Sequence, residues 1–231
     1  MVVKPENSPS DDRLIINNLS SEALGVETLK KTGSPKNLPS PAFDIVALTA
    51  SADGLNALSC ILSNLPSELP AALVIVQHLA PNYPSVLDKI LNRRTSLEVI
   101  QATEGCKLGP GKVFIAPPDY HLLVNPDGSL SLSQTAKVHF VRPSAEILFE
   151  SVAESYKDRA LAVVLTGGDG DGSTGVRAIK KMGGKVIAQD EATSKIWGMP
   201  LAAIQTGCVD WVLPLDKIAG AIANLVIQGK I

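Results

Sequence analysis

The chain has 231 residues and a formal net charge of −2, and 45% of its residues are hydrophobic whereas 4% are aromatic. These values indicate a globular protein with a sizeable core and exclude a largely disordered chain. The small charge and the few aromatic residues argue against a nucleic-acid partner or an acidic membrane surface. The apolar runs are only as long as strands, so we expect no membrane insertion.

The three cysteines are far apart in the sequence and form no CxxC pair. The first residues also lack the apolar segment of a signal peptide, and both features favour a cytoplasmic protein without structural disulfides or a zinc cluster. Residues 1–42 carry five prolines separated by polar residues, which predicts a poorly ordered tail or linker. The pattern becomes regular at Phe43, so we expect one folded domain at 43–231.

Strand-like and helix-like segments alternate from Phe43 onward. Short β-rich runs predict strands at 43–48, 72–77, 98–101, 112–116, 160–166, 184–189 and 209–213. Apolar residues at helical spacing predict helices at 55–62, 85–92, 144–156, 173–182, 199–206 and 215–227. Two more strands, 121–124 and 129–133, flank a typical hairpin turn. The sequence therefore predicts a doubly wound, Rossmann-like α/β fold: a mostly parallel sheet with helices on both faces and an antiparallel hairpin at one edge.

Polar residues follow three of the predicted strands. Ser51 comes after the first strand, His78 after the second and Asp171 after the strand at 160–166. Because the carboxyl ends of parallel strands lie at one edge of a sheet, we expect these side chains to meet there as a nucleophile, its base and the acid that orients the base. Ser51 is also expected to open the next helix, whose N–H groups help to hold an oxyanion. Taken singly, the three residues are equally typical of a helix cap, a hydrogen-bonded strand end and a turn.

The loop LTGGDGDGSTG at 165–175 allows a different interpretation. Its last six residues match GxGxxG between a strand and a helix, which is typical of a dinucleotide-binding domain. Against this, Asp169 and Asp171 place negative charge where a pyrophosphate would bind. A calcium loop is excluded, because a lysine lies where a bidentate glutamate is required. The scattered histidines form no metal site. We expect His121 and His139 at the surface, with the lining of a cleft as the alternative.

Three longer stretches carry a resemblance to a known family: VALTASADGLNAL at 46–58, VIVQH at 74–78 and GKVFIAP at 111–117. Shorter matches occur at His121, Arg142-Pro-Ser144, Leu165-Thr-Gly167, Asp171-Gly172, Ala188-Gln-Asp-Glu-Ala192 and Gly198-Met-Pro200. Together they resemble the bacterial chemotaxis receptor methylesterase family (CheB). The resemblance implies a hydrolase that removes methyl groups from glutamate methyl esters on chemoreceptors, and that in many members also deamidates receptor glutamines.

The resemblance also implies which residues do the chemistry. The triad of the family falls on Ser51, His78 and Asp171, and the reaction requires no cofactor and no metal. The candidates for the oxyanion pocket are Ala52, Gly167, Gly168 and Met199.

The partners implied are methyl-accepting chemotaxis receptors. Family members usually carry a receiver domain ahead of the esterase, and residues 1–42 are too few to form one. We therefore expect a stand-alone catalytic domain that is regulated, if at all, by a separate response-regulator protein or by the tail.

Thr49, Asp53 and Asp169 depart from the usual pattern of the family. Thr49 and Asp53 lie where it usually has glycine, and Gly168-Asp169 replaces its usual Met-Gly. A carboxylate beside a forming oxyanion opposes the negative charge, which predicts a slow esterase. The departures also leave a second hypothesis, a catalytically weak or inactive paralogue that acts as a receptor-binding signalling adaptor.

Overall fold

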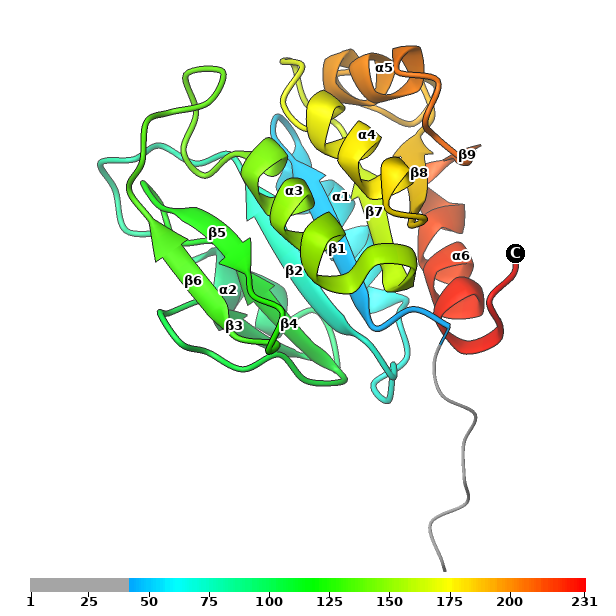
Figure 1. The fold of residues 1–231 in the computed structure, drawn as a ribbon, viewed down its shortest axis with the longest axis horizontal. Coiled ribbons are helices and arrows are strands. Elements are labelled where there is room, and N and C mark those ends of the chain that lie inside the picture. Colours follow the sequence, from blue (N-terminus) through cyan, green and yellow to red (C-terminus); the bar gives the residue numbers. More distant parts are fainter. Residues whose placement is uncertain (1–41) are drawn as a thin grey trace, which may run out of the picture. The chain divides into compact units, whose positions relative to one another are not determined.

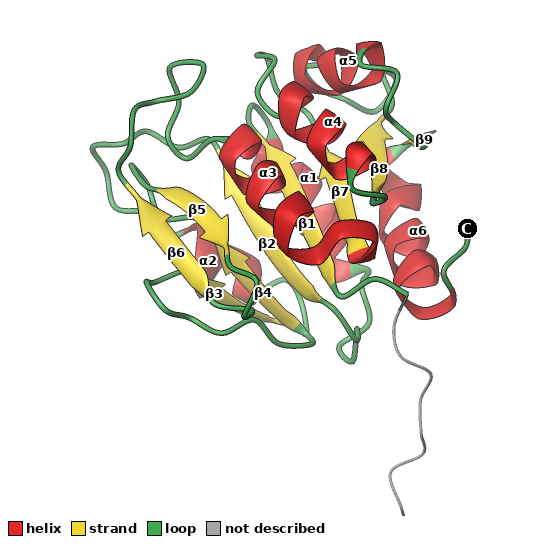
Figure 2. Ribbon diagram, in the orientation of Figure 1, coloured by secondary structure: helices red, strands yellow, loops and turns green. Residues whose placement is uncertain are grey.

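The computed structural model describes residues 42–231, so all but the last residue of the tail expected at 1–42 lies outside the described residues. The main strands are β1 (Ile45–Ala50), β2 (Ala72–Gln77), β3 (Glu98–Gln101), β4 (Lys112–Ile115), β7 (Ala160–Val164), β8 (Lys185–Gln189) and β9 (Trp211–Leu213). They form one seven-stranded sheet in the order β3-β4-β2-β1-β7-β8-β9, in which every neighbouring pair is parallel (Figures 1 and 2).

Strand β1 is the point at which the strand order changes direction. The strand that follows β1 in the chain, β2, pairs with one side of it, and β7 pairs with the other side. In a doubly wound sheet, ligands bind in the crevice beyond the carboxyl ends of the strands at such a switch point. The fold therefore brings together the residues that follow β1, β2 and β7.

Helices cover both faces of the sheet, as the sequence predicted (Figure 2). They are α1 (Gly54–Ser63), α2 (Leu87–Asn92), α3 (Ala145–Tyr156), α4 (Ser173–Lys181), α5 (Gly198–Gln205) and α6 (Leu215–Gln228), with a short 3-10 helix η1 (Lys157–Arg159) between α3 and β7. Alternate residues of β1 enter different hydrophobic clusters. Val46 and Leu48 pack with α1, α2 and α6, whereas Ile45 and Ala47 pack with α3, α4 and α5.

The expected antiparallel hairpin is present as β5 (His121–Val124) and β6 (Leu130–Ser133). It forms a two-stranded sheet of its own and is not hydrogen-bonded to an edge of the main sheet. Its buried Leu122, Val124 and Leu130 belong to the same hydrophobic cluster as α3. Side-chain packing against α3 and backbone hydrogen bonds to residues 105–108 thus hold the hairpin in place.

The predicted elements agree with the structure in type and order. The main difference is that α1 begins at Gly54 and not at Ser51. Asp53 has a left-handed φ of 64°, and the Gly54 N–H donates to the Ser51 carbonyl over 3.0 Å, so residues 51–54 form a turn before the helix. Within residues 42–231, no helix is long and apolar enough to cross a bilayer.

Candidate active site

Ser51 lies in the turn between β1 and α1, at the switch point of the sheet. Its N–H donates to the Thr166 carbonyl over 2.9 Å, and its carbonyl accepts from the side-chain amide of Gln77 over 2.8 Å. The same amide donates to the His78 carbonyl over 3.1 Å. Hydrogen bonds from both neighbouring strands therefore fix the Ser51 turn. The expectation that Ser51 opens the helix is wrong, because its N–H is already bonded before α1 begins.

Two of the four residues expected in the oxyanion pocket have N–H groups that are already used. The Gly167 N–H donates to the Ile196 carbonyl over 2.9 Å, and the Met199 N–H donates to the Gly167 carbonyl over 2.8 Å. The N–H groups of Ala52 and Gly168 are left as the candidate donors to an oxyanion.

Gly167 and Met199 pack beneath Ser51 instead. A Cβ atom on Gly167 would be 2.9 Å from the Cβ of Ser51 and would collide with the sulfur of Met199, which is buried. Only glycine allows this close approach. The Thr166 hydroxyl, next along the chain, donates to the Ala52 carbonyl over 3.0 Å and ties the Ser51 turn to the loop after β7.

Asp171 is a buried carboxylate held at the N-terminus of α3. Its Oδ1 accepts from the Ser144 hydroxyl over 2.6 Å and from the Glu146 N–H over 3.3 Å. Its Oδ2 accepts from the Ala145 N–H over 2.6 Å and lies 2.8 Å from Nε2 of His78. Helix N–H groups favour an anion at this position. Asp171 is therefore held by donors at the start of α3, with its carboxylate facing the His78 ring.

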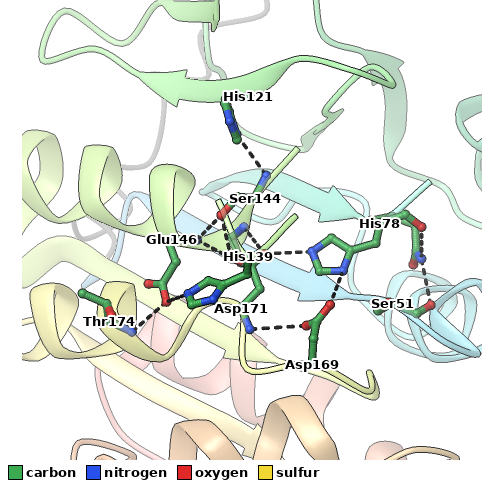
Figure 3. A network of polar contacts seen from close by, with 11 residues as sticks. Ser51, His78, His121, His139, Ser144, Glu146, Asp169, Asp171 and Thr174 are labelled. Carbon is green, nitrogen blue, oxygen red and sulfur yellow. Dashed lines mark hydrogen bonds and ion pairs between the residues drawn. The ribbon is translucent and has the colours of Figure 1, made fainter. Parts of the chain in front are cut away.

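Ser144 and His121 extend this network (Figure 3). The Ser144 N–H donates to Nδ1 of His121 over 3.2 Å, and Nε2 of His121 donates to the Ala136 carbonyl over 3.1 Å. His121 is fully buried, so the prediction that it lies at the surface is wrong, whereas His139 is about half exposed as expected. The sequence signal for Ser144 was its position as a helix cap, which gives no indication that it also holds Asp171.

His78 lies between two carboxylates (Figure 3). Its Nε2 is 2.8 Å from Oδ2 of Asp171, and its Nδ1 is 3.3 Å from Oδ2 of Asp169. Burial lowers the pKa of His78, but the contacts with Asp169 and Asp171 outweigh burial and raise the pKa to about 9. Asp169 thus contacts the imidazole, which the sequence did not indicate, and the raised pKa favours a protonated His78 ring at neutral pH.

Two cavities border these residues. A mostly apolar cavity of about 380 Å³ lies beside Ser51, and a cavity of about 200 Å³ lies beside His78. The first is lined by Ser51, Asp53, Gly54, Leu55, Gln77, Leu79, Pro84, Ser85, Val86, Leu87 and Ile90. An apolar cavity beside a hydroxyl, with a few polar groups, is the usual form of a small-molecule or side-chain binding site.

A family model described as CheB methylesterase matches residues 46–222. The chain belongs to the CheB methylesterase family. A solved structure of the CheB methylesterase catalytic domain of Thermotoga maritima has 37% sequence identity and a TM-score of 0.77, over 80% of this chain and 99% of that chain.

Curated relatives of the CheB methylesterase family have similar identities. The protein-glutamate methylesterase/protein-glutamine glutaminase 2 of Methanosarcina mazei is 43% identical over 190 residues, which are 79% of this chain and 52% of the relative. The protein-glutamate methylesterase FrzG of Myxococcus xanthus is 38% identical over 81% of this chain and 56% of the relative. The chain thus spans about half the length of these two relatives. A putative protein-glutamate methylesterase/protein-glutamine glutaminase of Leptospira interrogans is 38% identical, and the match covers 95% of it.

In this member of the CheB methylesterase family, Gly175 at the end of the 165–175 loop serves helix packing. A Cβ atom on Gly175 would be 2.6 Å from the Cβ of Phe149, so glycine lets α4 approach α3 closely. The N–H groups of Thr174 and Gly175 donate to the buried carboxylate of Glu146. A side chain of the protein therefore occupies the start of α4, where a dinucleotide would place its pyrophosphate. Among the described residues, no group of three or more histidine, cysteine or acidic side chains could hold a metal ion.

Proposed function

We propose that this protein is a serine hydrolase that removes methyl groups from glutamate methyl esters on chemoreceptors in chemotaxis signalling. The names of its relatives support the reaction class. The observation that carries the proposal is the 2.8 Å contact between His78 and the buried Asp171, at the same switch point as Ser51. Ser51 is the proposed nucleophile, His78 the general base, and Asp171 the acid that orients the ring and stabilises its protonated form.

The proposed reaction has two halves. Nε2 of His78 is bound to Asp171, so Nδ1 accepts the proton of the Ser51 hydroxyl. At the same time, the hydroxyl oxygen of Ser51 attacks the ester carbonyl. The N–H groups of Ala52 and Gly168 stabilise the oxyanion, the bond to the methoxy oxygen breaks, and methanol leaves with the proton from His78. Water then attacks the acyl-enzyme with His78 as base, which yields the glutamate carboxylate and restores Ser51. Base catalysis contributes about 10²–10⁴-fold and an oxyanion donor about 10²–10³-fold.

Receptor glutamines are the proposed second substrate. The same acyl transfer would release ammonia in place of methanol, and the relatives from Methanosarcina mazei and Leptospira interrogans carry glutaminase in their names. The proposed substrates imply a cytoplasmic protein that meets chemoreceptors. A separate response-regulator protein as its partner stays a prediction from the family resemblance.

The test is methanol release from methylated receptor membranes, together with labelling by a fluorophosphonate ester, which requires an activated serine. We expect labelling at Ser51, and we expect Ser51→Ala or His78→Ala to abolish both readouts. Ser59→Ala is the matched control, because Ser59 lies on α1, donates to the Leu55 carbonyl and lines neither of the two cavities. Methanol release that survives in Ser51→Ala would refute the assignment of the nucleophile.

A receptor-binding adaptor is the second candidate function. It is favoured by the position of His78, whose two ring nitrogens both face carboxylates and which is therefore a cation at neutral pH. A protonated imidazole cannot accept the Ser51 proton. An adaptor would bind receptor fragments yet resist fluorophosphonate at every pH, whereas an esterase would be labelled once His78 loses its proton.

A further inference from the structure

The two ring nitrogens of His78 have different roles in the proposed reaction. Nε2 is hydrogen-bonded to Asp171, so Nδ1 is the ring nitrogen that remains to accept the proton of Ser51. Nδ1 instead faces Asp169 at 3.3 Å. Within residues 42–231, no hydrogen bond joins the Ser51 hydroxyl to His78. Asp169 and Ser51 are therefore alternative partners for one nitrogen atom.

The two carboxylates are held very differently. The Asp171 side chain is fully buried and accepts from Ser144, Ala145 and Glu146. The Asp169 side chain is 36% exposed. Its contact with Nδ1 is an ion pair whose geometry is too poor for a hydrogen bond, since Nδ1 has no hydrogen-bond partner among the described residues. Of the two acids, only Asp169 is free to turn away from the ring.

The local sequence supports such a movement. Asp169 lies between Gly168 and Gly170, and glycine gives the backbone more freedom than any other residue. The hydrogen bond that its carboxylate accepts comes from the Asp171 N–H, at a long 3.3 Å. Apart from this hydrogen bond and the ion pair with His78, little would be lost if the Asp169 side chain turned toward solvent.

We propose that Asp169 is a positioning residue, whose carboxylate competes with Ser51 for Nδ1 of His78 and must leave the ring before the hydroxyl can be deprotonated. This inference rests on the proposed function. With Asp169 in place, the ring keeps a proton on each nitrogen. When Asp169 turns away, the Nδ1 proton passes to solvent, and the free lone pair can accept the Ser51 proton. A substrate that displaces Asp169 would thereby activate its own base.

Other charged groups border this pair, but they are engaged elsewhere or exposed. The contact with His78 is the main cause that lowers the pKa of Asp169, and His139 adds to it less. His139 lies 3.6 Å from the carboxylate of Glu146. Lys137 and Arg142 line the cavity beside His78. Arg142 is bound to Asp119 at 2.7 Å. Among the residues described, Asp169 is thus the one acid that contacts Nδ1, and its side chain is partly exposed.

The experiment compares Asp169→Asn and Asp169→Ala with the unmodified protein over pH 5.5–10.5. We expect kcat/KM of the unmodified protein to rise with pH until about 9. In the variants, we expect the midpoint to fall by about one pH unit or more and kcat/KM at pH 7 to rise about tenfold or more. Asp190→Asn is the matched control: Asp190 follows β8, and its carboxylate accepts from Thr193.

The pKa of His78 is also measured by NMR titration of its ring protons in the Ser51→Ala background, which needs no turnover. A lower pKa of His78 in Asp169→Asn supports the proposal, and an unchanged pKa with an unchanged pH profile overturns it. Absence of hydrolysis in every variant, together with a shifted His78 pKa, would instead refute the proposed function. The two failures are therefore distinguishable.

Discussion

The Ser144 hydroxyl donates a hydrogen bond to Oδ1 of Asp171 over 2.6 Å, and through this contact the start of α3 holds the acid that faces His78. The sequence predicted Ser144 as a helix cap, and it is one, since its oxygen accepts from the Glu146 N–H over 3.1 Å. A single hydroxyl therefore caps α3 and fixes Asp171. Its removal should reduce both stability and activity.

We expect Ser144→Ala to lower kcat/KM for ester hydrolysis about tenfold and the free energy of unfolding by about 1–2 kcal/mol, because a cap and a hydrogen bond to a charged group are lost together. Steady-state kinetics and urea unfolding measure the two effects. Ser155→Ala is the matched control, since Ser155 lies on the same helix and donates to the Val124 carbonyl. Equal losses of activity in both variants would contradict a specific role for Ser144.

Gln77 links the proposed nucleophile and base through the backbone, because its amide donates to the carbonyls of both Ser51 and His78. We expect Gln77→Leu to lower kcat about tenfold or more while KM changes little. We also expect it to lower the free energy of unfolding by about 1–3 kcal/mol, since two partly buried carbonyls lose their donor. Gln189→Leu also removes a buried amide at a strand end, one that bonds to Thr166 and Thr193. If Gln189→Leu lost as much stability and as much kcat as Gln77→Leu, the result would argue against a special role for Gln77.

Asp53 is a candidate cause of the slow ester hydrolysis that the sequence predicts. It lines the cavity beside Ser51, and its carboxylate accepts from the Asn56 amide over 2.6 Å. We expect Asp53→Gly to raise kcat/KM about ten- to a hundredfold, because a negative charge near the oxyanion is removed. Stability should change little, since a φ of 64° suits glycine.

Asp53→Asn separates charge from backbone effects, because asparagine also tolerates a left-handed φ. The same gain in both variants identifies the charge as the cause. A gain in Asp53→Gly alone would show that backbone strain limits the reaction, and no gain in either would mean that the Asp53 carboxylate points away from the reacting carbonyl.

The meeting of Ser51, His78 and Asp171 at one edge could be predicted because it follows from topology. Alternating strands and helices require a parallel sheet, and the residues after adjacent parallel strands must then lie together. The pairing of β1 with β2 and with β7 confirms that these strands are neighbours, and the triad itself stays a prediction. No side-chain direction had to be known for it.

The directions of loop side chains could not be predicted in the same way. Asp169 lies in a glycine-rich loop without periodicity, so the sequence did not indicate that it would contact His78 rather than the oxyanion. His121 lies in a four-residue strand, too short for alternation to decide which face is buried. It is buried because the Ser144 N–H and the Ala136 carbonyl satisfy both ring nitrogens, and these partners are distant in sequence.

The ion pairs of His78 also predict how stability depends on pH. The pKa of His78 is about 9 in the folded protein, against about 6.5 for an unperturbed histidine, so the folded state binds the extra proton between these values. The resulting stabilisation is fully present below pH 6.5 and is lost as the pH rises through 9. Its size is on the order of 3 kcal/mol.

Urea unfolding at pH 6, 7.5 and 9.5 measures this loss. We expect the free energy of unfolding to fall over this range in the unmodified protein, to fall less in Asp169→Asn, and to lose this component in His78→Gln, which cannot titrate. Apart from His78, all three proteins share the groups that titrate between pH 6 and 9.5, because the pKa of Asp169 lies well below this range. The differences between the three proteins therefore report on His78. The same decline in His78→Gln as in the unmodified protein would mean that other groups cause it, and that the two carboxylates do not hold a protonated ring between them.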